Sequence, residues 1–401
     1  MLEAPMPSKQ SVAPNVRSSG AWWAVVARFL VHGLVVSTWV SRIPGIQSSL
    51  RLSNGTLGLS LLGAAIGSII AIPICGWMVN RFGSSRVTTW SSACFCISLV
   101  LPALAVNAAT LFAALFVYGA AAGTNDVAMN AQGVAVELKV GTPTMSRFHA
   151  MFSLGGMVGA GIGAAIAARH ILPVWHLAGG GLLFLAITLS TTPLMLEVHD
   201  HAVAKSEGIS LRRFPAVLIA LSAIGFCILL SEGAMADWIG VYLKQVLKAG
   251  PGTAAAGYAA FSAGMAIFRL LGDAITLRLG PAKTVRMGAL IAAGGLVLAL
   301  AVSSPYWALP GFAAAGAGFS VIIPLVFGAG GRVKSVSRGA GIATVSGIGY
   351  FGFVFGPPAI GFVSQMSSLR WALLIVVGLS LFTAILAGAV NQDDAEEAVG
   401  V

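Results

Sequence analysis

The sequence contains few charged residues: only 9% of its 401 residues are Asp, Glu, Lys or Arg. A soluble globular domain carries about 25%, so this shortage excludes an ordinary soluble protein. Apolar residues take the place of the missing charge, with 57% of the chain hydrophobic and a mean hydropathy of +0.90. Long apolar runs of this kind are typical of integral membrane proteins, and the chain has room for about a dozen spans of roughly 20 residues each.

Cysteine is scarce as well. The four cysteines all lie inside apolar runs and are interpreted as reduced packing residues: Cys75, Cys94, Cys96 and Cys227. Cys94 and Cys96 are neighbours, but the sequence around them lacks the further ligands that zinc requires. We also find no nucleotide-binding loop, no Ser/His/Asp set and no metal-ligand cluster. We therefore expect no enzyme activity, no cofactor and no metal.

Clustered charge is missing too. The formal net charge is +10, but the basic residues are spread one to three per loop, which argues against a nucleic-acid partner. Residues 1–20 are polar and contain no short apolar core with a small-residue cleavage site. We therefore predict a disordered cytoplasmic tail and no signal peptide.

Twelve apolar segments fill the rest of the chain. They cover approximately residues 22–41, 57–79, 87–106, 110–136, 148–168, 174–195, 215–242, 253–277, 285–303, 306–330, 340–364 and 370–390. With this segmentation, fifteen Lys and Arg residues fall in loops on one side and six on the other. Positive charge collects on the cytoplasmic side. We therefore expect a multi-pass protein of a bacterial-type inner membrane with both termini in the cytoplasm.

One long polar stretch, residues 197–213, divides the chain near its middle. It contains His199, Asp200 and His201, which could clip a metal ion, but a solvated loop is the favoured interpretation. We predict five parts: a cytoplasmic tail (1–20), a six-helix half (21–196), a cytoplasmic linker (197–213), a second six-helix half (214–391) and a second tail (392–401).

The two predicted halves carry a short repeat. The loop after the second segment reads RFGSSR at 81–86, and the loop after the eighth reads RLGPAK at 278–283, 197 positions later. Both follow the pattern basic–apolar–Gly–x–x–basic. Parallel repeats of six spans are a recognised transporter design, with the substrate site near the midplane between the repeats.

The stretch 116–137 combines small residues with ionisable ones. Steps of four and three residues keep positions on one stripe of a helix. Here that stripe consists of Gly119, Gly123, Asp126, Asn130, Gly133 and Glu137. Such a helix packs closely on its neighbours. An ionisable residue inside a bilayer is functional by default, so Asp126 is the first candidate for a site.

With these features the chain is similar to the major facilitator superfamily over approximately residues 20–390. Its most specific element, GWMVNRFGSSR at 76–86, resembles the Gly-x-x-x-Asp-Arg-x-Gly-Arg-Arg loop signature of that family, which contributes to the gate between the halves. The resemblance implies gating roles for Asn80 and Arg81. The chain departs from the signature at Asn80, where the family has Asp, and at Ser84, where it has Arg. An amide can still cap a helix end.

Around Asp126 the chain resembles the fucose-permease branch of the same superfamily. Asp126-x-x-x-Asn130 is similar to the acid-x-x-x-Asn in the fourth span of that branch, where the acid is implicated in proton coupling. The resemblance implies a coupling role for Asp126. The branch also has an acid in its first span, but residues 37–44 (STWVSRIP) contain no carboxylate. Sugar specificity is therefore not implied by the resemblance.

The position of Asp126 along its helix supports the same role. It lies 11 residues from Glu137, or about 16 Å along a helix, which places it close to mid-membrane. A carboxyl group there could carry a proton. The alternative is a structural Asp bonded to neighbouring backbone or amides. We expect Glu137 to be a structural end charge, paired with Arg147 or Arg28.

The seventh segment contains Glu232, Asp237 and Trp238. Acids and an aromatic ring that face a central cavity would suit sugars or other small polar solutes, and would also suit a cation. The alternative places Asp237 and Trp238 near the outer membrane interface. The other candidates for substrate binding are Trp39, Asn125, Asn130 and Ser153.

Two residue pairs lie four positions apart on one helix face. We predict an ion pair between Arg269 and Asp273 that stabilises the inner ends of two helices, and we include both residues in the gate. His149 and Ser153 share a face of the fifth segment. His149 could take part in proton coupling as a relay, or it could be a histidine satisfied by a neighbouring helix.

Three further patterns concern packing. Arg28 and His32 could meet substrate or a carboxylate, or Arg28 could snorkel to the interface. Glycines at 155, 159 and 163 predict a close-packing face on the fifth segment. The Gly-Pro-Pro run at 356–358 predicts a kink or a broken helix in the eleventh segment.

Together these observations predict an all-α membrane protein with twelve transmembrane helices in two pseudo-symmetric halves. We expect a secondary transporter, not an enzyme, that moves a small polar organic solute such as a sugar or sugar derivative by proton symport. The alternative is a proton-antiporting exporter of organic cations or amphipathic compounds. The Gly-Pro pair of such exporters is absent from the fifth segment, because Met157 follows Gly156. The expected partners are the substrate, protons and the lipid bilayer, and we expect a monomer.

Overall fold

The computed structural model describes residues 20–142, 144–197, 215–334 and 336–391. The predicted tails and linker therefore lie almost entirely outside the described residues. In the first half the helices are α1 (Gly20–Val40), α2 (Ile43–Ser49), α3 (Asn54–Phe82), α4 (Ser84–Ser98), α5 (Ala108–Val140), α6 (Met145–Ala168) and α7 (Pro173–Thr191). In the second half they are α8 (Ala216–Gln245), α9 (Pro251–Leu279), α10 (Pro281–Ala301), α11 (Pro305–Phe319), α12 (Ile322–Gly330), α13 (Arg338–Met366) and α14 (Leu369–Leu386).

These helices make up 12 segments that are long and apolar enough to cross a membrane. The first span joins α1 to α2 and the tenth joins α11 to α12, while short 3-10 turns extend the third, sixth and twelfth. The prediction of an all-helical protein with twelve spans is confirmed.

Polar caps and prolines determine where many of the helices begin. Ser53 accepts a hydrogen bond from the Thr56 amide at the start of α3, and Asn107 forms a capping box with Thr110 at the start of α5. Prolines occupy the first turn of α7, α9, α10 and α11. A proline is tolerated there because the first helical N–H groups have no intrahelical partner. The boundaries of these spans are therefore specified locally.

Proline explains the break in the tenth span, but two prolines in the eleventh span do not break its helix. The tenth span breaks at Ser320 and Val321, four residues before Pro324, which has no N–H to donate to the Ser320 carbonyl. In the eleventh span, by contrast, α13 continues through Pro357 and Pro358. Of the two expected outcomes at 356–358, the broken helix is therefore wrong, and the kink stays a prediction.

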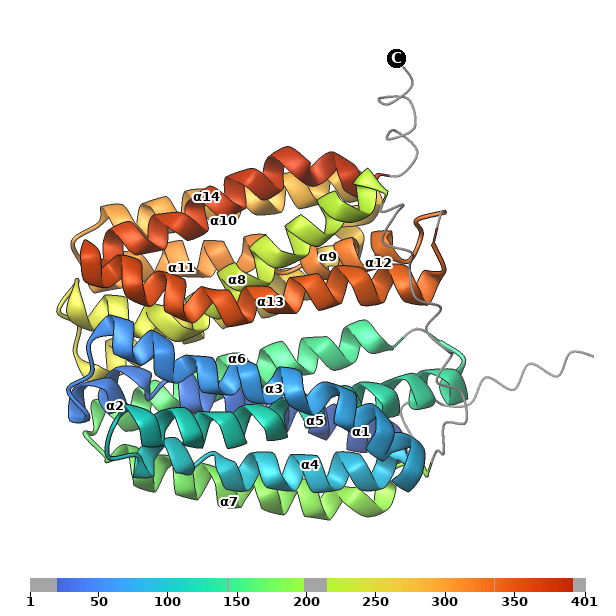
Figure 1. The fold of residues 1–401 in the computed structure, drawn as a ribbon, viewed down its shortest axis with the longest axis horizontal. Coiled ribbons are helices and arrows are strands. Elements are labelled where there is room, and N and C mark those ends of the chain that lie inside the picture. Colours follow the sequence, from blue (N-terminus) through green and yellow to red (C-terminus); the bar gives the residue numbers. More distant parts are fainter. Residues whose placement is uncertain (1–19, 143, 198–214, 335, 392–401) are drawn as a thin grey trace, which may run out of the picture.

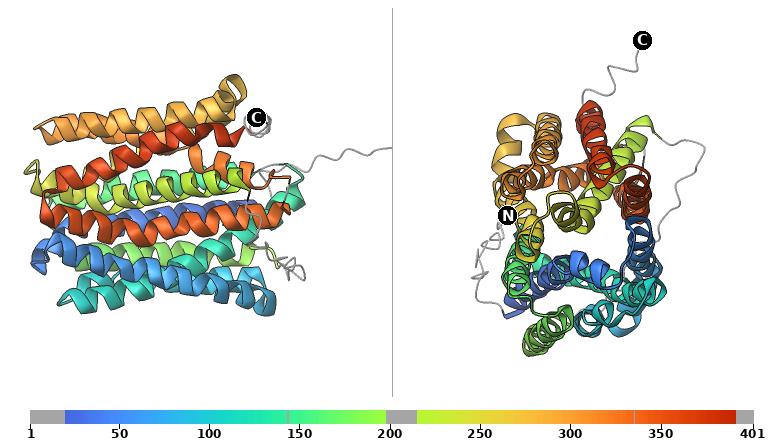
Figure 2. Two further views of the ribbon diagram at one scale, coloured as in Figure 1. Left: turned by 45° about the horizontal axis from the view of Figure 1, so that its top comes forward. Right: turned by 90° about the vertical axis from the view of Figure 1, so that its left-hand side faces the viewer.

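The helices form two bundles that lie side by side (Figure 1). Viewed along the helices, the bundle of α1–α7 and that of α8–α14 face each other (Figure 2, right). They meet mainly where α6 packs against α9 and α3 packs against α13. The predicted glycine face of the fifth span is confirmed, and it packs on α1, where Gly155 and Gly159 approach the Leu30 and Leu34 backbone.

The loop repeat corresponds to a structural repeat. α3 and α9 both contain 29 residues, and each ends at a glycine, Gly83 or Gly280, with a positive φ of 83° or 78°. The next helix, α4 or α10, begins at the following residue. The two halves therefore use the same tight connection after their second span.

The two ends of the bundle need names. We call the end that carries α2 and the α8–α9 connection the α2 end (Figure 1, left). The opposite end, where α3 turns into α4 and the described chain stops at Asn391, is the linker end.

Candidate functional site

Polar side chains from both halves meet inside the bundle, between its two ends. We call this group the central polar cluster and define it as Tyr118, Asp126, Asn130, His149, Ser153, Glu232, Asp237, Tyr258, Arg269 and Tyr350. The first five come from α5 and α6 of the first half, and the others from α8, α9 and α13 of the second. Asp126, Asn130, His149, Ser153, Glu232, Asp237 and Arg269 are candidates from the sequence; the three tyrosines are not.

Arg269 of α9 joins the two halves. Its Nη1 donates a hydrogen bond of 2.9 Å to Ser153 Oγ of α6, and its Nε donates one of 3.0 Å to the Ser320 carbonyl. Because Pro324 cannot donate to that carbonyl, Arg269 supplies the missing hydrogen bond at the break in the tenth span. The guanidinium also interacts electrostatically with Glu232 and Tyr258. Arg269 is therefore a bridging residue between halves.

The predicted ion pair between Arg269 and Asp273 is wrong. Asp273 is exposed on α9, whereas the Arg269 guanidinium is directed to Ser153 and the Ser320 carbonyl. Among the described residues, these two side chains form no ion pair. The orphan carbonyl and the serine hydroxyl offer buried partners, while an exposed pair gains little in water.

Glu232 lies on α8 and faces Arg269. One of its carboxyl oxygens, Oε1, is buried and has no hydrogen-bond partner among the described residues. A buried carboxyl group with spare hydrogen-bonding capacity is uncommon and calls for an explanation. Within a membrane span it is suited to hold a proton or to accept a hydrogen bond from a ligand.

Asp237 lies toward the α2 end of α8 and faces aromatic side chains. It interacts electrostatically with Tyr118 of α5 and Tyr258 of α9. The Trp39 ring of α1 lies 6.3 Å from the Tyr118 ring, and Trp39 is buried. Asp237 therefore lies between the two halves and not at the outer membrane interface.

Asp126 lies on α5 and interacts electrostatically with Tyr350 of α13 in the opposite half. Its Oδ1 accepts a hydrogen bond of 3.2 Å from Asn130 Nδ2, which also donates to the Asp126 carbonyl at 2.8 Å. Asn130 thus holds the carboxyl group of Asp126, as the structural alternative foresaw. The carboxyl group nevertheless faces across the interface, where a proton or ligand could reach it.

His149 and its neighbours extend the cluster into the first half. His149 interacts electrostatically with Arg269 and with His32, and its ring lies edge-on to Phe29 at 5.1 Å. His32 shares a hydrogen bond of 2.9 Å with Asn125 Nδ2. The two histidines therefore connect the central polar cluster to the interior of the first bundle.

Asn125 lies in that interior and not in the central polar cluster. It is 2% exposed, and its Oδ1 accepts hydrogen bonds from Ser91 and Ser92 of α4. Because both its Oδ1 and its Nδ2 are hydrogen-bonded within the first bundle, Asn125 cannot contact substrate in this conformation. Its assignment as a substrate-binding residue is therefore corrected to a structural one, because one residue along α5 rotates the side chain by about 100° from Asp126.

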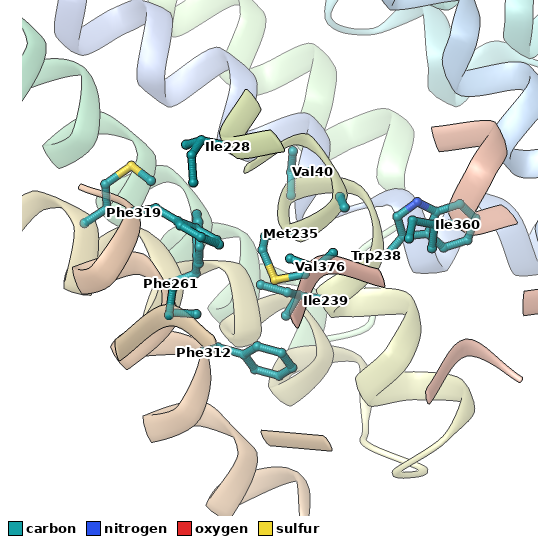
Figure 3. Close-up of a cluster of buried hydrophobic side chains, with 14 of the residues drawn as sticks. Val40, Ile228, Met235, Trp238, Ile239, Phe261, Phe312, Phe319, Ile360 and Val376 are labelled. Atoms are coloured by element: carbon teal, nitrogen blue, oxygen red, sulfur yellow. The ribbon is translucent and has the colours of Figure 1, made fainter. Parts of the chain in front are cut away.

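Trp238, another candidate for substrate binding, is also buried. It is fully buried, and Figure 3 shows it beside Ile360 of α13, in the hydrophobic cluster that includes Met235 and Ile239. In this conformation Trp238 packs at the interface of α8 and α13, and its Nε1 has no hydrogen-bond partner among the described residues. Its role in substrate binding stays a prediction.

Among the described residues, no hydrogen bond or ring contact joins Asn80 or Arg81 of the loop signature to the second half. Asn80 and Arg81 are exposed at the linker end, and the described contact of Arg81 is with the ring of Phe82 next to it. Gating by these residues is therefore not engaged in this conformation and stays a prediction.

Two end charges have different partners from those expected. Glu137 accepts hydrogen bonds from the Thr144 and Met145 amides at 2.6 and 2.9 Å, so it caps the start of α6 instead of pairing with arginine. Arg28 is buried, and it donates to Thr192 Oγ1 and Met195 Sδ. It neither snorkels nor meets a carboxylate among the described residues.

The sequence reading missed Tyr118, Tyr258 and Tyr350. A signal for them exists, because the chain has only 5 tyrosines and these three lie within apolar segments. A phenol there carries a polar group that needs a partner when buried. The hydroxyl of Tyr118 is buried and has no partner among the described residues.

The fold and the cluster together define a multi-pass membrane transporter with a polar site between two six-helix halves. Residues 24–334 match the model of the Major Facilitator Superfamily. The chain belongs to this family, and it is therefore a secondary transporter and not an enzyme.

Individual relatives support the family without defining a substrate. An uncharacterised MFS-type transporter of Yersinia pestis is 35% identical, covering 91% of this chain and 94% of that protein. The nucleoside transporter NupG has a similar fold, with a TM-score of 0.69, 13% identity and coverage of 94% and 100%. The fucose:proton symporter FucP of E. coli gives a TM-score of 0.61, 17% identity and coverage of 93% and 100%. At these identities the solved structures show the fold alone.

Proposed function

We propose that this chain is a proton-coupled symporter of a small polar organic solute, with sugars and sugar derivatives as the first candidates. The central polar cluster is the proposed site for both the solute and the proton. Access to it would alternate as the two halves rock about the cluster. We further propose that the linker end faces the cytoplasm of a bacterial-type inner membrane, following the distribution of basic residues.

One observation carries this proposal: three carboxyl groups inside the membrane spans lie near the interface of the halves, and two of them interact with a residue of the opposite half. Asp126 faces Tyr350, Asp237 faces Tyr118, and Glu232 faces Arg269 from within its own half, next to Ser153 of the other. Ionisable groups in a bilayer are expensive and mark ion and proton pathways. Their placement at the interface couples their protonation to the relative position of the halves.

The lining of the cluster supports a polar and uncharged solute. Carboxyl, phenol and amide groups provide donors and acceptors for hydroxyl groups, and the rings of Tyr118, Tyr258 and Tyr350 provide apolar faces. FucP, which shares the fold, is named as a fucose:proton symporter. That name describes FucP, and it serves here only as a precedent for sugar symport on this fold.

The second candidate is a proton-antiporting exporter of organic cations. It is favoured by the excess of acid in the cluster, where Asp126, Glu232 and Asp237 are accompanied by Arg269 as the single arginine. A cation would then compete with protons for the same carboxyl groups. Everted membrane vesicles separate the two candidates, because an imposed proton gradient drives a symported solute and an antiported one in opposite directions.

The test of coupling is the Asp126→Asn variant, which mimics a permanently protonated carboxyl group. A ligand is first found by thermal-shift screening of the purified protein with a set of sugars and polyols. In proteoliposomes, Asp126→Asn should retain counterflow, because exchange needs no release of the proton. It should fail to accumulate the solute under a proton gradient, so that the internal concentration does not rise above the external one.

The matched control is Glu197→Gln, which removes an exposed acid outside the cluster and outside the predicted gate. It should keep both counterflow and proton-driven accumulation. If Asp126→Asn also keeps both, the coupling role is refuted. If it loses both, the structural interpretation of Asp126 is favoured over the coupling role.

A further inference from the structure

Three amide side chains connect the two halves at the α2 end. Gln47 of α2 donates to Asn54 Oδ1 of α3 at 2.8 Å, Asn54 Nδ2 donates to Gln245 Oε1 at 3.1 Å, and Gln245 Nε2 donates back to Gln47 Oε1 at 3.1 Å. Gln245 Nε2 also lies 3.1 Å from Asn54 Oδ1. We call Gln47, Asn54 and Gln245 the amide triad. Gln245, the last residue of α8, is its single member from the second half.

Further bonds between the halves surround the triad. Lys244 Nζ donates to the Pro44 carbonyl at 3.0 Å and to Ser48 Oγ, both on α2. On the other flank, Gln365 Oε1 of α13 accepts from the Gly55 amide and from Ser53 Oγ, each at 3.2 Å. All partners of these donors and acceptors are neutral groups.

The linker end differs. The hydrogen bond between Arg269 and Ser153 lies in the central polar cluster, and past it toward the linker end Asn80 and Arg81 are exposed. Leu138 and Leu277, near the ends of α5 and α9, are 78% and 88% exposed. The hydrogen bonds described between halves are therefore concentrated at the α2 end, which is closed in this structure.

We propose that the amide triad and Lys244 form the gate that closes the α2 end of this transporter. When the transporter changes to the conformation that is open at the α2 end, the bonds of Gln245 and Lys244 to the first half must break. Because the triad contains no charge, its contribution to the gate does not depend on ionic strength, and the Lys244 ammonium bonds only neutral groups of α2. The proposal rests on alternation between two states and not on the substrate or on proton coupling.

Gln245→Leu tests the gate, because leucine is similar in size but removes every bond of the triad between halves. Distances are measured by pulsed electron paramagnetic resonance on spin-labelled, full-length protein with its four native cysteines replaced. One label pair, at Val106 and Tyr306, reports on the α2 end, and another, at Leu138 and Leu277, reports on the linker end. All four side chains are at least 70% exposed.

The expected result is a shift of population. Losing the triad bonds should lower the ratio of molecules closed at the α2 end to molecules open there by about tenfold. The distance between Val106 and Tyr306 labels should lengthen in that population, and the distance between Leu138 and Leu277 labels should shorten. The change in this ratio that Gln245→Leu causes should be the same at low and high salt, because the bonds that it removes join neutral groups.

Adjacent serines on α2 provide a matched pair of milder variants. Ser48→Ala removes a partner of Lys244 across the interface, whereas Ser49→Ala removes a hydroxyl that donates to Ile46 in its own helix. Ser48→Ala should shift the population in the same direction as Gln245→Leu, and Ser49→Ala should leave it unchanged. Unaltered distance distributions in both Gln245→Leu and Ser48→Ala would overturn the proposal. These measurements need no substrate, so their failure is distinct from failure of the proposed transport.

Discussion

Arg269 shows how a single side chain serves both the fold and the candidate site. Its Nε satisfies the Ser320 carbonyl, which has lost its helical donor to Pro324, and its Nη1 reaches Ser153 in the other half. The same guanidinium is the positive charge beside Glu232. A change in the relative position of the halves must therefore alter the surroundings of Glu232, because Ser153 moves with the first half.

The structural part of this role leads to a prediction. Arg269→Met leaves the Ser320 carbonyl without a donor and should lower the free energy of unfolding by about 1–3 kcal/mol. Pro324→Ala restores an N–H four residues after Ser320. In the Arg269→Met background it should therefore recover about 1 kcal/mol, measured by denaturant unfolding of the purified protein in detergent.

Comparing the two single variants with the double variant isolates the interaction free energy between positions 269 and 324. In the Arg269 background, Pro324→Ala should gain less, because the carbonyl already has a partner. Strictly additive effects of the two substitutions would show that Arg269 does not replace the missing helical hydrogen bond.

At the scale of elements, the same connection follows the second span of each half. Gly83 and Gly280 combine positive φ values of 83° and 78° with ψ values of 148° and 159°. This region is open to glycine and strained for other residues. Each glycine ends one helix and precedes the next directly, so that two helices run antiparallel with a single residue between them.

The backbone conformation at these glycines sets the cost of replacing them. Gly280→Ala and Gly83→Ala should each lower the free energy of unfolding by about 1–3 kcal/mol. At Gly280 crowding cannot explain such a loss, because nothing lies within 4 Å of an added Cβ. Thermal unfolding of the purified variants measures the effect.

Gly76→Ala is the matched control. Gly76 lies inside α3, also with nothing within 4 Å of an added Cβ, and it has no positive φ. Alanine is favoured over glycine in a helix interior by about 0.5–1 kcal/mol, so Gly76→Ala should be neutral or stabilising. A loss of stability at Gly76 as large as that at Gly280 would contradict the explanation from backbone conformation.

At the scale of the whole molecule, twelve spans return the chain to its starting side. The described chain begins at Gly20 and ends at Asn391, at the same end of the bundle as the turn between α3 and α4. With more Lys and Arg in the loops of this end, the positive-inside rule predicts that it faces the cytoplasm.

Reporter fusions test this orientation. Fusions after residue 20, within 197–213 and after 391 should all report a cytoplasmic location, whereas fusions at 106 and 306, at the α2 end, should report the opposite side. The measurement is the activity of reporters that function on only one side of the membrane. A periplasmic signal from the linker would overturn the proposed orientation.

The sequence by itself determined the number of spans, many of their boundaries, the loop repeat and the family. These features depend on composition, caps and prolines within about 20 residues, so they can be recognised without knowing what packs against what. The acids at 126, 232 and 237 could be singled out for the same reason, since an ionisable residue in an apolar segment is unusual wherever it points.

Only the tertiary structure decided which polar residues meet. Asn125 and Asp126 are neighbours in sequence, as are Asp237 and Trp238, yet in each pair one side chain faces the other half and one is buried in packing. Successive side chains on a helix differ by about 100° in direction, and the rotation of each helix is set by its contacts with several others. The hydrogen-bond partners of Arg269 and of Gln245 lie more than 50 residues away or in the other half, so no local pattern could identify them.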